Sequence, residues 1–144
     1  MASRSRPAGE LQNAVAFRTA LRRFLARTRI VTEEAGLTPE RYDLLLAIAA
    51  AGGEVRVGDL REVLQLRQTA VSELVKRAAD AGLVLKGPAP DDRRAVSLRL
   101  SVEGDRRLTR AFRALGADRD ALLASFAVAN QRLRRTAVSA GRTR

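Results

Sequence analysis

The sequence predicts a mainly helical protein that carries a small pair of β-strands, and the stretch from residue 55 to residue 100 holds most of the evidence. Two segments with helical spacing of apolar residues come first, and two segments with strand-like alternation follow. A loop rich in proline, aspartate and arginine separates the two strands. Two helices followed by two strands with a basic loop between them is the order of a winged helix-turn-helix, in which that loop is the wing.

The second helix of this stretch is predicted over residues 67–81, after a short first helix over residues 57–64. Its apolar residues recur at intervals of three and four, which places them on one side. That side is formed by Ala70, Val71, Leu74, Val75 and Ala78. Gly82 stands where a left-handed C-terminal cap is expected, so the helix is predicted to end there.

The two strands are predicted at residues 83–86 and 96–100, where Val96, Leu98 and Leu100 alternate with polar residues. The intervening loop, residues 87–94, contains two prolines and a glycine. We therefore expect it to stay out of regular pairing and to expose its arginines.

The polar face of the helix over residues 67–81 is a candidate for reading DNA. In the major groove Gln can pair with adenine edges and Lys with guanine, while a loop arginine suits the narrow minor groove. A polar helix face is more often simply solvated, but here the turn, the strands and the basic loop beside it favour DNA reading. The candidate readers are Gln68, Thr69, Ser72 and Lys76.

Composition bounds the function further. The chain has 144 residues, enough for one domain, and its net charge of +11 favours a polyanionic partner. Because it has neither Cys nor His, a disulfide, a thiol sensor, a His-containing triad and a Cys/His zinc site are all excluded.

We expect no cofactor, no metal and no enzyme activity, since the adjacent Asp91 and Asp92 are better explained as wing residues than as an acid/base pair. Without a signal peptide or a run near the ~20 apolar residues that span a bilayer, the chain is expected to be cytoplasmic.

Helices are predicted on both sides of the winged region. One runs from residue 10 to about residue 34 and ends at Gly36, and a supporting helix follows from Thr38, an N-cap, to about residue 51. After the strands, Ser101 is expected to cap a helix, Gly116 to interrupt it and Asp118 to cap another. The apolar stripes of the outer helices lie outside the winged core, so we expect them to pack against a second copy. Packing onto their own core, or binding a membrane surface, is a less favoured alternative.

The chain is accordingly divided into a winged domain at 37–101 and a helical dimerisation region at 10–36 and 102–138. Residues 1–9 and 139–144 are predicted to be disordered tails, the first of them small and basic.

In this arrangement the chain resembles the multiple antibiotic resistance regulator (MarR) family of transcription factors, from residue 11 to about residue 133. The most specific segments are LTPERYDLL at 37–45, VSELVKRAADAGLV at 71–84 and DRRAVSLRLSVEG at 92–104. The resemblance implies a homodimer that binds a near-palindromic operator in double-stranded DNA, most often to repress. It also implies that Arg94 enters the minor groove beside Arg93, and that Asp92 helps to hold the wing.

The resemblance further implies release of DNA when a small aromatic or phenolic molecule binds between the outer helices and the reading domain. Phe24, Arg27 and Tyr42 are the candidate lining residues, although Tyr42 also fits an ordinary core position. The alternative function is a basic winged-helix module that binds RNA or a protein without operator specificity. Few aromatic residues are left for stacking on single-stranded RNA, which disfavours the RNA alternative.

The chain departs from the family at the starts of its two reading helices. Arg56 and Arg67 stand where the family often has Ser or Thr caps, and neither can accept a backbone N–H. We expect Arg67 at the DNA surface, and Arg56 and Arg77 on phosphates. Glu73 lies on the reading face, where it repels phosphate unless it accepts from cytosine or pairs with a neighbouring cation.

Overall fold

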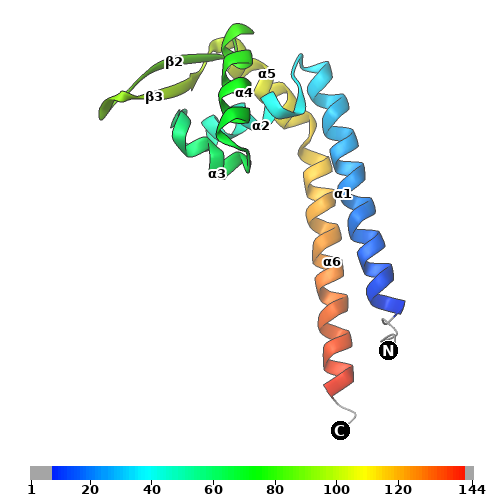
Figure 1. The fold of residues 1–144 in the computed structure, drawn as a ribbon. Helices are drawn as coiled ribbons and strands as arrows, with labels where there is room; N and C mark the ends of the chain where they lie inside the picture. Colours follow the sequence, from blue (N-terminus) through cyan, green and yellow to red (C-terminus); the bar gives the residue numbers. More distant parts are fainter. Residues whose placement is uncertain (1–7, 142–144) are drawn as a thin grey trace. The chain divides into compact units, whose positions relative to one another are not determined.

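The computed structural model describes residues 8–141, apart from the side chains of residue 133 and residues 136–141. The described chain divides into two units (Figure 1). The central unit is Arg29–Ala114, and the outer unit consists of the helical segments that precede and follow it in the sequence. The predicted tails lie mostly outside the description, since it leaves out residues 1–7 and 142–144. Where it reaches them, at residues 8–9 and 139–141, the chain is helical rather than disordered.

The order of elements confirms a mainly helical winged helix-turn-helix with a small sheet. The elements are α1 Ala8–Glu34, α2 Pro39–Ala50, β1 Glu54–Arg56, the 3-10 turn η1 Val57–Asp59, α3 Leu60–Leu64, α4 Gln68–Asp80, β2 Val84–Ala89, β3 Asp92–Leu100, α5 Val102–Ala114 and α6 Gly116–Gly141.

Local capping explains where several helices begin and end. Thr38 has an extended backbone and its Oγ1 accepts a hydrogen bond from Arg41 N at 3.2 Å, which confirms it as the N-cap of α2. Gly36, with φ 74°, ends α1 as expected. The predicted cap at Asp118 is wrong: α6 begins at Gly116, so Asp118 lies in its first turn, where its charge suits the helix N-terminus.

The sheet is antiparallel with the order β1-β3-β2, and it corrects two predictions. β1 was not predicted; Glu54, Val55 and Arg56 pair with Arg99, Leu98 and Ser97 of β3. The segment at 57–64 is therefore not one helix, because η1 leads out of this strand before α3 begins.

The prediction that residues 87–94 stay out of regular pairing is wrong for residues 87–89 and 92, whereas Arg93 and Arg94 have no partner in β2 and are exposed as expected. Strands β2 and β3 continue into this segment, and only residues 90–91 form the turn between them. Pro88 pairs opposite Val96, which is tolerated because β2 is an edge strand where a missing N–H leaves no partner unsatisfied.

The core of the central unit is built from the apolar faces of its helices and the inner face of the sheet. Nine apolar side chains that are at most 1% exposed define it: Leu44, Leu45, Ile48, Leu60, Val71, Ala78, Leu83, Leu98 and Ala111. Because α4 contributes Val71 and Ala78 to this core, its opposite face is turned to solvent.

Ser101 joins the end of α4 to the start of α5. Its Oγ donates to the carbonyl oxygen of Gly82 at 2.6 Å and accepts from Gly104 N at 2.9 Å, which confirms the predicted cap. Gly104 is needed for the same contact, because a Cβ there would lie 2.0 Å from the carbonyl oxygen of Leu83.

Helix α5 also holds the chain that follows α1. Arg107 Nη1 donates to the carbonyl oxygen of Gly36 at 2.7 Å, while its Nε donates to Glu103 Oε1 at 2.7 Å. Hydrogen bonds from Arg106 and then Arg107 lower the pKa of Glu103 to about 2, so this carboxylate stays charged at neutral pH.

In the outer unit, α1 and α6 lie side by side (Figure 1). The rings of Phe17 and Phe126 stack with centroids 5.1 Å apart, and Arg27 pairs with Asp118 at 3.5 Å. Within residues 8–141, no helix combines the length and apolar character that crossing a membrane requires.

We expect Gly104→Ala to lower the free energy of unfolding by about 2 kcal/mol. The added methyl would displace the Leu83 backbone, at a cost that exceeds the helix-propensity gain of about 1 kcal/mol. Urea unfolding measures the change. The control is Gly58→Ala, which adds a methyl to open space and should shift stability by less than about 1 kcal/mol. Equal effects in the two variants would contradict the close approach.

Candidate nucleic-acid interface

The predicted readers all lie on the outer face of α4. Val71, Val75 and Ala78 hold the helix in the core. The four predicted readers are exposed, and so are the two other residues expected at the DNA surface; the six are Arg67, Gln68, Thr69, Ser72, Glu73 and Lys76. The structure therefore brings the six side chains together on one helix, with their polar ends available to a ligand outside the unit.

The turn that sets α4 against α3 is tight. Gln65 closes α3 in the left-handed conformation, with φ 55°, and its Nε2 donates to the carbonyl oxygen of Glu62 at 2.6 Å. Arg67 has an extended backbone at the start of α4 and makes no side-chain cap hydrogen bond. Arg67 therefore does not cap the first backbone N–H groups of α4, as the sequence indicated.

The charges along α4 are partly paired. Arg77 Nη2 donates to Glu73 Oε2 at 3.2 Å, one helical turn away, and both side chains are about 70% exposed. Arg77 was predicted to contact phosphate, which stays a prediction; in this structure it is the neighbouring cation with which Glu73 pairs, as the sequence allowed. Lys76 is exposed on the same helix. Gln68 Nε2 donates a hydrogen bond to Ser72 Oγ at 3.5 Å.

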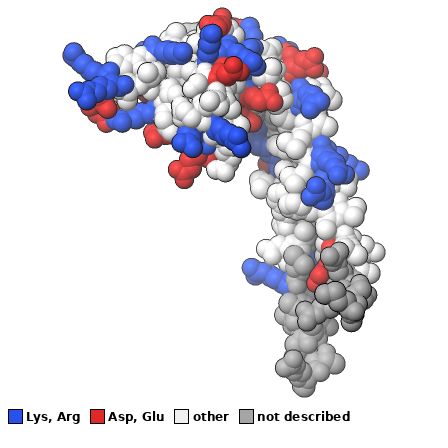
Figure 2. All heavy atoms as spheres, in the orientation of Figure 1, with Lys and Arg blue, Asp and Glu red and all other residues white. Residues whose placement is uncertain are grey.

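The wing is a bent hairpin whose tip carries the predicted arginines. Asp92 and Val96 of β3 face Ala89 and Pro88, which are adjacent in β2, so residues 93–95 have no partner in that strand. A bulge of this kind bends the strand and turns side chains outward. Arg93 and Arg94 lie in it and are exposed; Figure 2 shows basic side chains gathered at this end of the hairpin.

Two carboxylates hold the wing tip. Asp92 Oδ1 accepts from Arg94 N at 3.0 Å, a local turn that agrees with the holding role expected for Asp92. Asp91 Oδ1 pairs with Arg56 Nη2 at 2.5 Å, with the two side chains 73% and 39% exposed. The hydrogen bond between them lowers the pKa of Asp91 and raises that of Arg56.

Sequence reasoning missed the pairing of Arg56, which it assigned to phosphate. The two partners lie 35 positions apart, and β1, which places Arg56 beside the wing, was not predicted. Alternation of Glu54 and Arg56 around Val55 was the available signal, since it marks a half-buried strand. On the same strand Glu54 Oε1 accepts from the buried Ser97 Oγ at 2.6 Å, which fastens β1 to β3.

The three predicted ligand-lining residues are divided between the two units. Tyr42 is a core residue of the central unit, only 5% exposed. Phe24 belongs to the outer unit and lines a hollow of about 240 Å³ together with Arg23 and Asp118. Arg27 is ion-paired with Asp118 in the outer unit as well.

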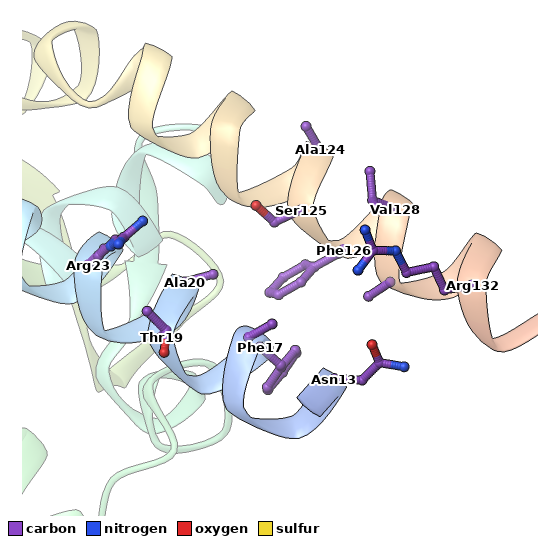
Figure 3. Close-up of a pocket in the computed structure, with 12 residues that line it drawn as sticks. Asn13, Phe17, Thr19, Ala20, Arg23, Ala124, Ser125, Phe126, Val128 and Arg132 are labelled. Atoms are coloured by element: carbon purple, nitrogen blue, oxygen red, sulfur yellow. The ribbon is translucent and has the colours of Figure 1, made fainter. Parts of the chain in front are cut away.

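The outer unit has a second hollow, a groove of about 540 Å³ between α1 and α6. The stacked Phe17 and Phe126 form its floor, and Figure 3 shows Arg23 and Arg132 toward its two ends. The helices beside it expose large apolar side chains, each at least 46% accessible: Leu11, Val15, Phe17, Leu25, Leu123 and Val128. Clustered exposed apolar side chains of this kind are typical of an interaction surface.

A family model described as the MarR family matches residues 35–95. These residues include α2, α3, α4, β2 and most of the wing, and so nearly all the predicted readers of the central unit. No curated protein sequence matches the chain significantly.

Solved structures show the same fold over almost the full chain. AbsC, a MarR family transcriptional regulator from Streptomyces coelicolor, is similar with a TM-score of 0.74 and 18% identity, over 95% of this chain and 97% of AbsC. A mutant of MarR from E. coli complexed with operator DNA gives a TM-score of 0.67 and 18% identity, over 83% and 89% of the two chains. NadR in complex with 4-hydroxyphenylacetate gives a TM-score of 0.68 and 19% identity, over 96% of this chain and 96% of NadR. At these identities the likeness shows a shared fold.

Proposed function

We propose that this chain, a winged-helix protein of the MarR family, is a repressor that binds a near-palindromic operator as a homodimer. The observation that carries the proposal is the exposed polar face of α4, which shares one unit with an arginine-bearing hairpin. Binding, rather than catalysis, accounts for both features. The MarR structure in complex with operator DNA supports the choice of DNA as the partner.

In this proposal the N-terminal half of α4 enters the major groove. Gln68 and Lys76 have the donors that adenine and guanine edges accept, and Thr69 and Ser72 can contact either bases or phosphates. The uncapped N–H groups at the start of α4 suit a phosphate, because that helix end is electropositive. Glu73, paired with Arg77, is available to accept from a cytosine amino group.

The wing supplies the second contact. Arg94, exposed on the bulge, is proposed to enter the minor groove, and Arg93 to contact the flanking phosphates. Because phosphate contacts carry little sequence information, the wing should add affinity and α4 should add base preference.

The homodimer part of the proposal is supported by the apolar surface of α1 and α6. Two such surfaces packed together would remove the exposed leucine, valine and phenylalanine side chains from water. A two-fold axis would then place the two α4 helices roughly 34 Å apart, one turn of DNA, which matches a near-palindrome.

The effector part of the proposal is a small aromatic or phenolic molecule that releases DNA. NadR was solved with 4-hydroxyphenylacetate, a molecule of this class. In this chain the hollow beside Phe24 combines an aromatic ring with Arg23, which suits an aromatic acid.

The direct test is binding to the protein's own promoter fragment and to random DNA, titrated in salt. We expect the wild type to prefer the promoter by about a thousandfold. Arg94→Ala should reduce the slope of log affinity against log salt by about 1, because it removes one positive charge from the DNA contact surface. Gln68→Ala should leave that slope unchanged and relax base preference by about 1–3 kcal/mol at its position.

Two results would go against the proposal. Weak binding of the wild type that is equal on both DNAs and lost at moderate salt would favour an RNA or protein partner. Equal loss of base preference in the two variants would remove the division of labour between helix and wing.

We expect the wild type to have twice the chain mass of 15.7 kDa, and Leu123→Arg to have a single chain mass. Leu123 is 65% exposed in the outer unit, and a buried unpaired guanidinium would be costly in a dimer. Light scattering measures the mass. The matched control is Val102→Arg, at a valine of α5 that is 90% exposed and outside the proposed interface, and it should remain dimeric. A monomeric wild type, or a dimeric Leu123→Arg, would contradict the interface.

A further inference from the structure

We propose that Arg56 and Asp91 form a latch that fixes the bent wing tip to strand β1, and that Arg94 reaches DNA only when this latch is closed. Arg56 and Asp91 are thus positioning residues of the wing. The inference rests on the proposed DNA-binding function, because its consequence is measured as operator affinity.

The first step is that pairing between β2 and β3 holds the tip of the hairpin only through the single pair Ala89–Asp92. Beyond Val96 the ladder is interrupted, and residues 93–95 have no partner in β2. Asp92 orders the turn locally through Arg94 N, but both ends of that hydrogen bond lie within the tip. It therefore cannot set the angle between the tip and the sheet.

The second step is that the Arg56–Asp91 pair joins the tip to a different strand. Arg56 lies opposite Ser97 in β1, and β1 is itself fastened by the Glu54–Ser97 hydrogen bond. Asp91 lies in the turn, one residue before Asp92. The 2.5 Å contact is consequently the tie between the wing tip and the opposite edge of the sheet.

The third step concerns charge. A carboxylate at the tip of a wing that approaches DNA repels the phosphates by Coulomb interaction. Its ion pair with Arg56 also lowers DNA affinity, because it engages a guanidinium that could otherwise contact a phosphate. Position alone therefore predicts that removing Asp91 tightens DNA binding. If Asp91 instead acts through the latch, its removal weakens binding, and the sign of the effect separates the two explanations.

The test compares operator affinity of Asp91→Ala with that of Asp59→Ala. Asp59 is an exposed carboxylate whose side chain caps no helix and which attracts Arg56 by Coulomb interaction without a hydrogen bond, so its removal changes the same charge and leaves the Arg56–Asp91 hydrogen bond in place. We expect Asp91→Ala to bind about threefold more weakly, the size typical of an exposed ion pair, and Asp59→Ala to bind as the wild type or more tightly. Equal tightening in both variants would overturn the latch.

Two further arms show whether the loss acts through Arg94. In the Arg94→Ala background, Asp91→Ala should change operator affinity by less than a factor of about 1.5, because the side chain that it positions is gone. The charge-swapped double variant Arg56→Asp with Asp91→Arg should bind more tightly than Arg56→Asp alone and more tightly than Asp91→Arg alone. Two results would overturn the proposal. The first is an undiminished loss of operator affinity when Asp91→Ala is added to Arg94→Ala. The second is a charge-swapped double variant that binds no more tightly than the two single variants.

Amide hydrogen exchange over residues 88–95 tests the latch without DNA. Exchange should be faster in Asp91→Ala than in the wild type and unchanged in Asp59→Ala. A wild type that does not prefer operator DNA, with this exchange difference present, would overturn the proposed function and leave the tie between wing and β1 standing. Unchanged exchange in Asp91→Ala would overturn the latch, whatever the wild type binds.

Discussion

The structure depends on the burial of one face of α4. Val71, Val75 and Ala78 are fixed in the core between α2, α3 and β2, and this burial determines how far the helix is rotated about its axis. The polar residues on the opposite face are exposed as a result of this burial. The candidate DNA surface is in this sense a consequence of hydrophobic packing, and a change in the core face would rotate or loosen the readers before it altered their chemistry.

The parts that could be predicted are those that local patterns encode. Periodicity of three and four residues located α4, and cap chemistry located Thr38 and Ser101, because both signals lie within one or two turns of chain. The exposure of Gln68 and Arg94 was predicted in the same way, from residue type on a helix face and in the wing, and their DNA contacts stay a prediction. The comparison with known families agrees with this core, since the family model matches residues 35–95.

The parts that could not be predicted are pairings between distant segments. Strand β1 has only three residues, so its alternation of Glu54 and Arg56 around Val55 is a weak signal. Pro88 disguised the continuation of β2, because the edge position of that strand was not visible in the sequence. Because β1 was not predicted, the ion pair between Arg56 and Asp91 was not predicted either, and Arg56 was expected only on phosphate. Ion pairs between distant residues depend on which strands lie side by side. A net charge of +11 therefore does not reveal which arginines are ion-paired with a carboxylate.

The most direct test of DNA reading by α4 and the wing uses the absence of cysteine in the chain, since an introduced thiol is then unique. Thr69→Cys and Arg93→Cys would each carry an iron chelate that cleaves nearby DNA when bound to the promoter fragment. Cleavage from position 69 is expected at the major groove of each half-site, and cleavage from position 93 at the flanking minor groove. The same cleavage pattern from both positions, or unlocalised cleavage from either, would contradict the proposed placement of helix and wing.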